Sequence, residues 1–367
     1  MSRSASARPT SEPVPSHLAP LNEAQRAAAT VPAPVLLLAG AGSGKTETLT
    51  RRVADLILAR GEAPERLLCI TFTARAAEEM RTRLVALLGP ARTPRWVGTF
   101  HAIMARLLIE DGADALHLPR GFVILNQQDA RTVLMQVAGI DDAKEGSTLA
   151  EAVSLVRNAL PASPRRSPRS TALARLEPEL VARATKLLPA YAAALERQGA
   201  LDFDDLIVRP VAAMRADPLL AARWSGRWSE ILVDEYQDTN DAQHALVRLL
   251  AGGAGRVFAV GDDLQAIYGW RGAEVTHIRR FGKDHPRAPT PLTLEINYRS
   301  TPTILRAANA VASRDHEALP KTLRSADPRA PAGAAIAVRA LATPEDEGAE
   351  VVRWLRALRE RQTDLPW

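Results

Sequence analysis

Residues 39–46, with the sequence AGAGSGKT, constrain the fold of this chain more than any other feature. They follow an apolar run at residues 35–39 and precede a helical pattern at residues 49–58. A strand, a glycine-rich loop and a helix in this order form a phosphate-binding P-loop. The glycines let backbone N–H groups surround phosphates, Lys45 reaches the β and γ phosphates, and the Thr46 hydroxyl coordinates Mg²⁺. The expected nucleotide contacts are Ala39, Gly40, Ala41, Gly42, Ser43, Gly44, Lys45 and Thr46.

Short apolar runs predict a parallel α/β sheet around this loop. They lie at residues 35–39, 67–72, 230–233 and 256–260, and turn or helix signals follow each run. Between the second and third runs the pattern is mainly helical, for example at 102–110, 127–138 and 178–198, which predicts an inserted helical domain. Residues 334–341 predict a strand, and residues 345–360 predict an amphipathic helix with Val351, Trp354, Leu355 and Leu358 inward. One strand and one helix cannot form a core alone, so this stretch either packs on the first domain or is a severed part of a larger one, and we favour the second.

Composition limits the class of protein. The chain has 367 residues, of which 46% are hydrophobic and 24% charged, as in soluble proteins of more than one domain. A formal net charge of +5 permits a polyanionic partner, and no apolar run is long enough for a membrane span. The single cysteine, Cys69, is expected in the core, which fits a reducing cytoplasm. Residues 1–17 read as a disordered tail, and residues 160–171 as an exposed basic loop.

Two carboxylates end the third apolar run, in the sequence ILVDEYQD at residues 231–238. Ionised groups at the end of a buried strand are costly unless they hold a metal or a proton. Asp234 would hold magnesium through water, and Glu235 would polarise the attacking water. Such a pair can also cap a helix, but its place beside a P-loop favours catalysis.

The fourth run continues into VGDDLQAIYGWRGA at residues 260–273. Gln265 is a candidate sensor of the γ-phosphate. Tyr268 and Trp270 offer flat faces on which bases stack, at about 1 to 3 kcal/mol each. The alternative is that both aromatics belong to the core. For Trp270, flanked by Gly269 and Arg271, the sequence favours exposure.

Together with further motifs in the same order, these features resemble the UvrD/Rep/PcrA group of superfamily 1A DNA helicases. LNEAQRAA (21–28) resembles the Q motif, CITFTARAAEEMRTR (69–83) motif Ia and VGTFHAI (97–103) motif Ib. LDFDDLI (201–207) resembles the motif ahead of the second carboxylate strand, and LEINYRSTPTIL (294–305) resembles motif IV. The resemblance implies adenine contacts from Gln25 and Tyr298, and an arginine finger at Arg299. It also implies a single-stranded DNA site formed by Thr71, Phe72, Thr73, Arg75, Thr99, His101, Tyr268, Trp270 and Arg271.

The resemblance also implies a domain plan. A RecA-like domain 1A would comprise residues 18–103 and 226–289, a helical domain 1B residues 104–225, and an incomplete second RecA-like domain 2A residues 290–367. The expected activity is ATP- and Mg²⁺-dependent 3′-to-5′ movement on single-stranded DNA, or on DNA with a 3′ single-stranded tail, in repair or replication. Motifs V and VI are not in the chain, which places unwinding by this polypeptide alone in doubt.

Departures from the family pattern and competing interpretations remain. Glu47 stands where relatives usually carry Arg, and Leu264 and Ala266 replace an acid and a Ser. One alternative is the motor part of a RecB- or AddA-like helicase–nuclease. The other is a nucleotide- or DNA-binding module that no longer hydrolyses ATP.

Overall fold

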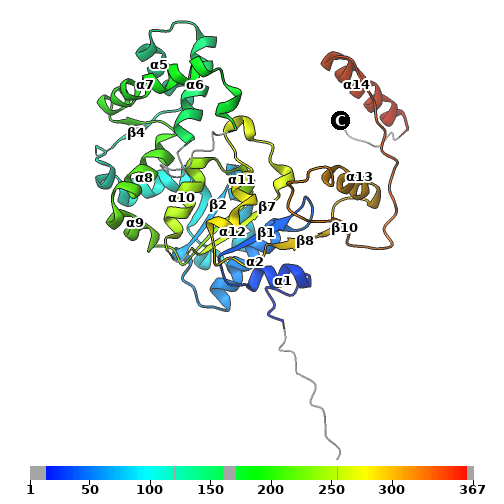
Figure 1. The fold of residues 1–367 in the computed structure, drawn as a ribbon. Coiled ribbons are helices and arrows are strands. Elements are labelled where there is room, and N and C mark those ends of the chain that lie inside the picture. Colours follow the sequence, from blue (N-terminus) through cyan, green and yellow to red (C-terminus); the bar gives the residue numbers. More distant parts are fainter. Residues whose placement is uncertain (1–13, 120, 160–170, 254, 362–367) are drawn as a thin grey trace, which may run out of the picture.

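A computed structural model of the chain describes residues 14–119, 121–159, 171–253 and 255–361. Its centre is a six-stranded parallel sheet with the order β3-β2-β6-β7-β1-β8 (Figure 1). The strands are β1 (Val35–Ala39), β2 (Leu67–Thr71), β3 (Trp96–Thr99), β6 (Glu230–Val233), β7 (Val257–Gly261) and β8 (Leu292–Leu294). The four predicted strands are confirmed within a residue, and the α/β prediction is confirmed with them.

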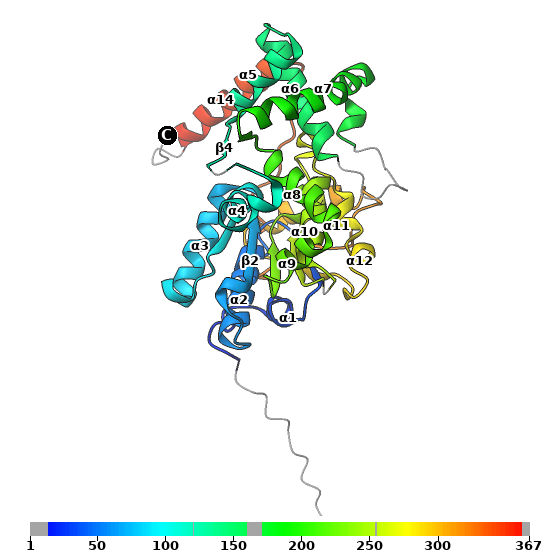
Figure 2. The same ribbon diagram turned by 90° about the vertical axis from the view of Figure 1, so that its left-hand side faces the viewer.

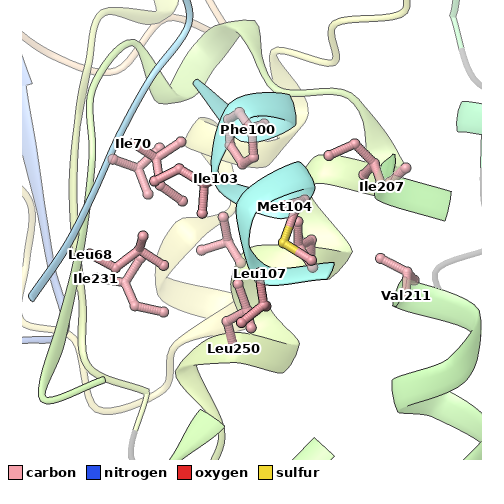
Figure 3. Packing of buried hydrophobic residues seen from close by; sticks show 14 of the residues in the cluster. Leu68, Ile70, Phe100, Ile103, Met104, Leu107, Ile207, Val211, Ile231 and Leu250 are labelled. Carbon is pink, nitrogen blue, oxygen red and sulfur yellow. The ribbon is translucent and has the colours of Figure 1, made fainter. Parts of the chain in front are cut away.

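The sheet is buried on both faces, which explains why its strands read as unbroken apolar runs. On one face, Leu67 and Cys69 pack with α2 (Lys45–Leu58) and α3 (Ala74–Leu88). On the other face, Leu68 and Ile70 pack with α4 (Phe100–Leu107), α8 (Asp205–Ala216), α9 (Pro218–Ser225) and α10 (Asp241–Ala251). Figure 3 shows the second core, in which α4 lies between the strand residues Leu68, Ile70 and Ile231 on one side and Ile207 and Val211 of α8 on the other.

The predicted helical insertion has a core of its own. It consists of α5 (Gln127–Ala138), α6 (Ala143–Asn158) and α7 (Pro178–Arg197), which enclose Leu134, Val153 and Tyr191. These helices stand above the sheet layer (Figure 2). A short parallel pair, β4 (Val123–Ile124) with β5 (Ala200–Leu201), joins the two ends of the insertion. Helices α8 and α9, which fall within the residues predicted as the helical domain, pack in the core beside the sheet.

The segment predicted as the second domain contributes one strand to the central sheet. Strand β8 pairs with β1, so the sheet extends past the predicted boundary at residue 290. Beyond it, β9 (Ile296–Asn297) pairs with β10 (Arg324–Ser325), and α13 (Pro302–Ala312) lies between them in sequence. The strand predicted at 334–341 is wrong, because within the described part of the chain these residues pair with no other strand. Helix α14 (Pro344–Arg361) is present as predicted, but its apolar face is exposed and away from the sheet.

The remaining expectations concern the ends and the loops. Cys69 is buried as predicted, and burial raises its pKa to about 12. His17 lies 3.1 Å from Asp55 of α2, so this residue is not part of a free tail. Residues 1–13 and most of the predicted basic loop, 160–170, lie outside the described part of the chain. Within that part, no helix is both long and apolar enough to cross a membrane.

Candidate nucleotide-binding site and nucleic-acid interface

The loop between β1 and α2 has the geometry of an anion-binding turn. Gly42 and Gly44 have φ values of 75° and 86°, a region that favours glycine. A Cβ on Gly44 would lie 2.4 Å from Nε2 of Gln25. Because α2 begins at Lys45, the unpaired N–H groups of its first turn lie beside the loop. The loop and the helix N-terminus therefore form a cradle suited to phosphates.

Lys45 joins this loop to the predicted acidic strand. Its ammonium lies 2.9 and 2.8 Å from the two carboxylate oxygens of Glu235, although 190 residues separate them. Glu235 has a φ of 49°, which is uncommon for a residue with a side chain. Gln237, which the sequence reasoning did not single out, donates a hydrogen bond from Nε2 to Glu235 at 2.8 Å. The P-loop cation and the candidate base thus form one preorganised unit.

Asp234 is the buried member of the acidic pair. Desolvation, with a smaller contribution from Glu235, raises its pKa to about 6. The backbone N–H of Glu235 donates to its Oδ1 at 3.0 Å. A divalent cation would stabilise the ionised form of such a carboxylate. With the Thr46 hydroxyl, Asp234 provides the hard oxygen ligands that fit Mg²⁺.

The adenine-side candidates lie on the other flank of the loop. Nε2 of Gln25 donates to the Ser43 carbonyl at 3.0 Å, and the Tyr298 backbone N–H donates to the Gly42 carbonyl at 2.9 Å. Asn22, which the sequence reasoning missed, donates from Nδ2 to the Tyr298 hydroxyl at 2.8 Å. The structure therefore brings the Q motif and motif IV together across the P-loop.

Asn297 fixes the turn that carries the candidate arginine finger. Its Nδ2 donates to the Ala41 carbonyl at 2.6 Å, and its Oδ1 accepts from the backbone N–H groups of Arg299 and Ser300 at 2.9 and 2.7 Å. The side chain of Arg299 is exposed beside the loop, with its Cβ next to Gly42. An asparagine ahead of a turn was the available signal for Asn297, because such side chains bond the backbone two residues on.

Two further residues near the phosphate end, Gln265 and Glu47, have partners within the protein. Nε2 of Gln265 donates to Oδ2 of Asp262 at 2.6 Å. Glu47, which departs from the family pattern, pairs with Arg51 one turn along α2 and lies 3.7 Å from Arg83. The negative charge of Glu47 is therefore paired with two arginines.

A row of aromatic rings lies at the carboxyl edge of the same sheet. The ring centroid of Phe72, after β2, is 5.0 Å from that of Tyr268, and Tyr268 is 6.5 Å from Trp270. The Arg271 guanidinium lies 4.8 Å from the Trp270 ring. Trp270 is 55% exposed, so the core alternative for this residue is wrong. Rings and a cation in one row are the elements from which single-stranded nucleic-acid sites are built.

A cleft of about 610 Å³ continues from this row toward the helical insertion. Phe72, Thr99, His101, Trp270 and Arg271 all line it. Burial lowers the pKa of His101, which favours its neutral form. Phe203, which the sequence reasoning did not assign, also lines the cleft, 44% exposed and 5.6 Å from His101. The available signal in the sequence was a phenylalanine between two aspartates.

The predicted threonines differ in what they can contact. Thr73 and Thr99 cap α3 and α4, each accepting a backbone hydrogen bond through its hydroxyl, at 3.1 and 3.2 Å. Thr71 is buried, and its hydroxyl donates to the Thr73 carbonyl at 3.1 Å. The Thr71 side chain therefore supports the turn that carries Thr73. Arg75 is exposed in the first turn of α3.

Comparison with known proteins identifies one family. Residues 21–286 match the family model described as the UvrD/REP helicase N-terminal domain. The chain is 38% identical over 346 residues to an ATP-dependent DNA helicase PcrA from Leuconostoc citreum, covering 92% of this chain and 44% of that protein. It is 40% identical over 315 residues to DNA helicase II from Salmonella typhimurium, covering 83% of this chain and 42% of that protein. The chain thus spans less than half the length of these relatives.

Proposed function

The chain belongs to the UvrD/REP helicase family, and from this premise we propose that it carries the ATP-hydrolysing and DNA-gripping part of a DNA helicase. The full activity would be ATP-dependent 3′-to-5′ movement on single-stranded DNA, in repair or replication and in the cytoplasm. The observation that carries the proposal is the Lys45–Glu235 pair, which joins the phosphate cradle to the candidate base. The aromatic row lies at the same edge of the sheet.

The pair suggests how the nucleotide activates the site. Lys45 would exchange Glu235 for the β and γ phosphates, because an ammonium and a polyphosphate attract strongly in a cradle of N–H groups. Glu235 would then be free to accept a proton from the attacking water, while Gln237 holds one of its oxygens. Thr46 and Asp234 would hold Mg²⁺, which supplies positive charge at the reacting phosphates when bound.

The remaining site residues would bind the ends of the nucleotide. Tyr298 would stack on adenine and Gln25 would hydrogen-bond its edge, since both flank the loop and Tyr298 is exposed. Arg299 would stabilise the charge that develops during phosphoryl transfer, as arginine fingers do. Gln265 would leave Asp262 to contact the γ-phosphate.

The aromatic row and the cleft would bind single-stranded DNA, including the single-stranded tail of a 3′-tailed duplex. Phe72, Tyr268 and Trp270 would stack on bases, and Arg75 and Arg271 would contact phosphates. Thr99 and His101, at the N-terminus of α4, line the cleft and would contact the DNA backbone there, and Thr73 would contact it from the N-terminus of α3.

The test is ATP hydrolysis by the purified chain with and without single-stranded DNA, together with binding of a fluorescent ATP analogue. We expect Mg²⁺-dependent turnover that Glu235→Gln lowers by about a hundredfold or more, with little loss of nucleotide binding. Glu179→Gln, an exposed glutamate on α7, is the matched control and should behave as the wild type.

The outcomes separate the alternatives. Turnover that DNA stimulates would support a coupled motor. Nucleotide binding without Glu235-dependent turnover would favour a binding module. The absence of nucleotide binding would refute the P-loop assignment.

A further inference from the structure

A lysine from the segment after α13 reaches back to the loop that follows β7. The ammonium of Lys321 lies 2.9 Å from Oδ1 of Asp262 and 2.6 Å from Oδ1 of Asp263. The Lys321 side chain is 4% exposed, and that of Asp263 is fully buried. The Leu319 backbone N–H donates to the second oxygen of Asp263 at 2.9 Å. This contact therefore joins two segments about 60 residues apart through buried charges.

Asp262 connects this lysine to two candidate catalytic residues. Its Oδ2 accepts from Gln265 at 2.6 Å, as described above. Its backbone N–H donates to Oε1 of Gln237 at 3.0 Å, and Nε2 of Gln237 donates to Glu235. The Asp262 carboxylate thus contacts Gln265, the candidate γ-phosphate sensor. The Asp262 backbone is linked through Gln237 to Glu235, the candidate base.

The charge balance makes Lys321 important for this arrangement. Buried carboxylates are strongly destabilising without a paired cation. Arg279 also approaches Asp263, at 3.3 Å, but it is shared with Asp315 at 2.6 Å and Glu317 at 3.0 Å. Among the ion pairs of the described residues, Asp262 is paired with Lys321 alone.

The packing around Gln237 leaves little freedom for a compensating shift. A Cβ added to Gly261 would lie 2.4 Å from Oε1 of Gln237 and 2.8 Å from a methyl carbon of Ile278. Gln237 is itself 1% exposed. A shift of the Asp262 backbone would therefore also move the Gln237 side chain, and with it the hydrogen bond that Gln237 donates to Glu235.

We propose that Lys321 is a positioning residue for ATP hydrolysis, which holds the Asp262–Asp263 turn so that Gln265 and Glu235 keep their working positions. The proposal rests on the ATPase activity proposed above. Lys321 lies outside the phosphate cradle, so it acts through Asp262 and not on the nucleotide. It would also make hydrolysis depend on the placement of the segment after α13.

The experiment compares Lys321→Met with the wild type, with Lys321→Arg, and with Lys186→Met, an exposed lysine on α7. Turnover, the Kd of a fluorescent ATP analogue and backbone hydrogen exchange read by mass spectrometry are measured for each. For Lys321→Met we expect turnover to fall about ten- to a hundredfold with the Kd within about twofold. Exchange should become faster at residues 262–265, and Lys321→Arg should restore part of the turnover.

A double variant, Lys321→Met with Asp263→Asn, covers the case in which the single variant does not fold. It removes one charge of each sign, yet Asp262 still lacks its cation, so turnover should remain low. Unchanged exchange at 262–265, or wild-type turnover in a folded variant without Lys321, overturns the inference. If the wild type binds nucleotide but does not hydrolyse it, the proposed ATPase activity is refuted, and the inference about Lys321 is refuted with it. If the wild type hydrolyses ATP and the variants without Lys321 do so equally well, only the inference is refuted.

Discussion

Helices α2 and α14 are both amphipathic, yet only α2 lies within a core. Helix α2 has 14 residues and buries eight of them, including the charged Arg52. Helix α14 has 18 residues, and no residue in it is buried. Trp354 of α14 is 61% exposed, and Val351 and Leu355 beside it are also exposed. The comparison teaches that an amphipathic pattern predicts a helix but not the surface that covers it.

The two helices form for local reasons that the sequence contains. In α14, Glu345, Asp346 and Glu347 stand in the first turn and Arg359 and Arg361 in the last, which complements the helix dipole. Helix α2 begins after the left-handed Gly44, and its apolar residues face β1 and β7. Only α2 has strands against which to pack, because in the described part of the chain no sheet lies opposite α14.

The largest expected effect is at the first residue of α2. Lys45→Ala should lower ATP turnover by at least about a hundredfold, because the cradle loses its cation and Glu235 loses its partner. The fold should remain intact, since Glu235 is partly exposed and water can solvate it. Turnover and the thermal midpoint are measured with Lys186→Ala as the control. Wild-type turnover would contradict the P-loop assignment.

The next effect tests the buried charge of α2. Arg52 is fully buried, and its guanidinium bonds both carboxylate oxygens of Glu230 at the start of β6. Arg52→Met should lower the free energy of unfolding by about 3 to 5 kcal/mol, because Glu230 stays buried without a partner. Arg51→Met, which breaks the more exposed pair with Glu47, should cost about 1 kcal/mol or less. Both free energies of unfolding are measured by denaturant titration. Equal losses for the two variants would mean that the buried ion pair contributes no more to stability than the more exposed one.

Trp270 and Trp354 are both exposed, but only Trp270 belongs to the aromatic row. Trp270→Ala should weaken binding of single-stranded DNA by about 1 to 3 kcal/mol, because a base loses its stacking surface. Trp354→Ala should leave the Kd unchanged, since none of the described residues that line the cleft belongs to α14. The two values are compared by fluorescence anisotropy at one salt concentration. An unchanged Kd for Trp270→Ala would remove this ring from the DNA site.

The smallest effect is on the stability of α14. Trp354→Ser should change the free energy of unfolding of the chain by less than about 0.5 kcal/mol, because the side chain already faces solvent. Trp224→Ser, a fully buried tryptophan of α9, should cost about 3 to 5 kcal/mol in the same assay. A loss above about 2 kcal/mol for Trp354→Ser would show that α14 packs against another surface in solution.

Much of the fold was predictable because parallel strands are buried on both faces and so appear as apolar runs. Strands β3 and β8 were missed, since Thr99 and Gly98 dilute the first, and the second has only three residues. The amphipathic pattern of α8 does not reveal which of two cores its apolar face joins, and the structure places that face in the core beside the sheet. The predicted strand at 334–341 failed because pairing depends on a partner far away in sequence.

The order of the motifs, the left-handed glycines of the P-loop and the ends of most helices follow from the sequence, because they depend on neighbouring residues. Which side chains meet depends on how distant segments pack together. The tertiary structure places Lys45 against Glu235, Asn22 against Tyr298 and Lys321 against Asp262, pairs that lie far apart along the chain. In each pair, at least one residue follows a strand of the central sheet. Because the strands are parallel, their carboxyl ends lie at one edge, and the loops that follow them come together there.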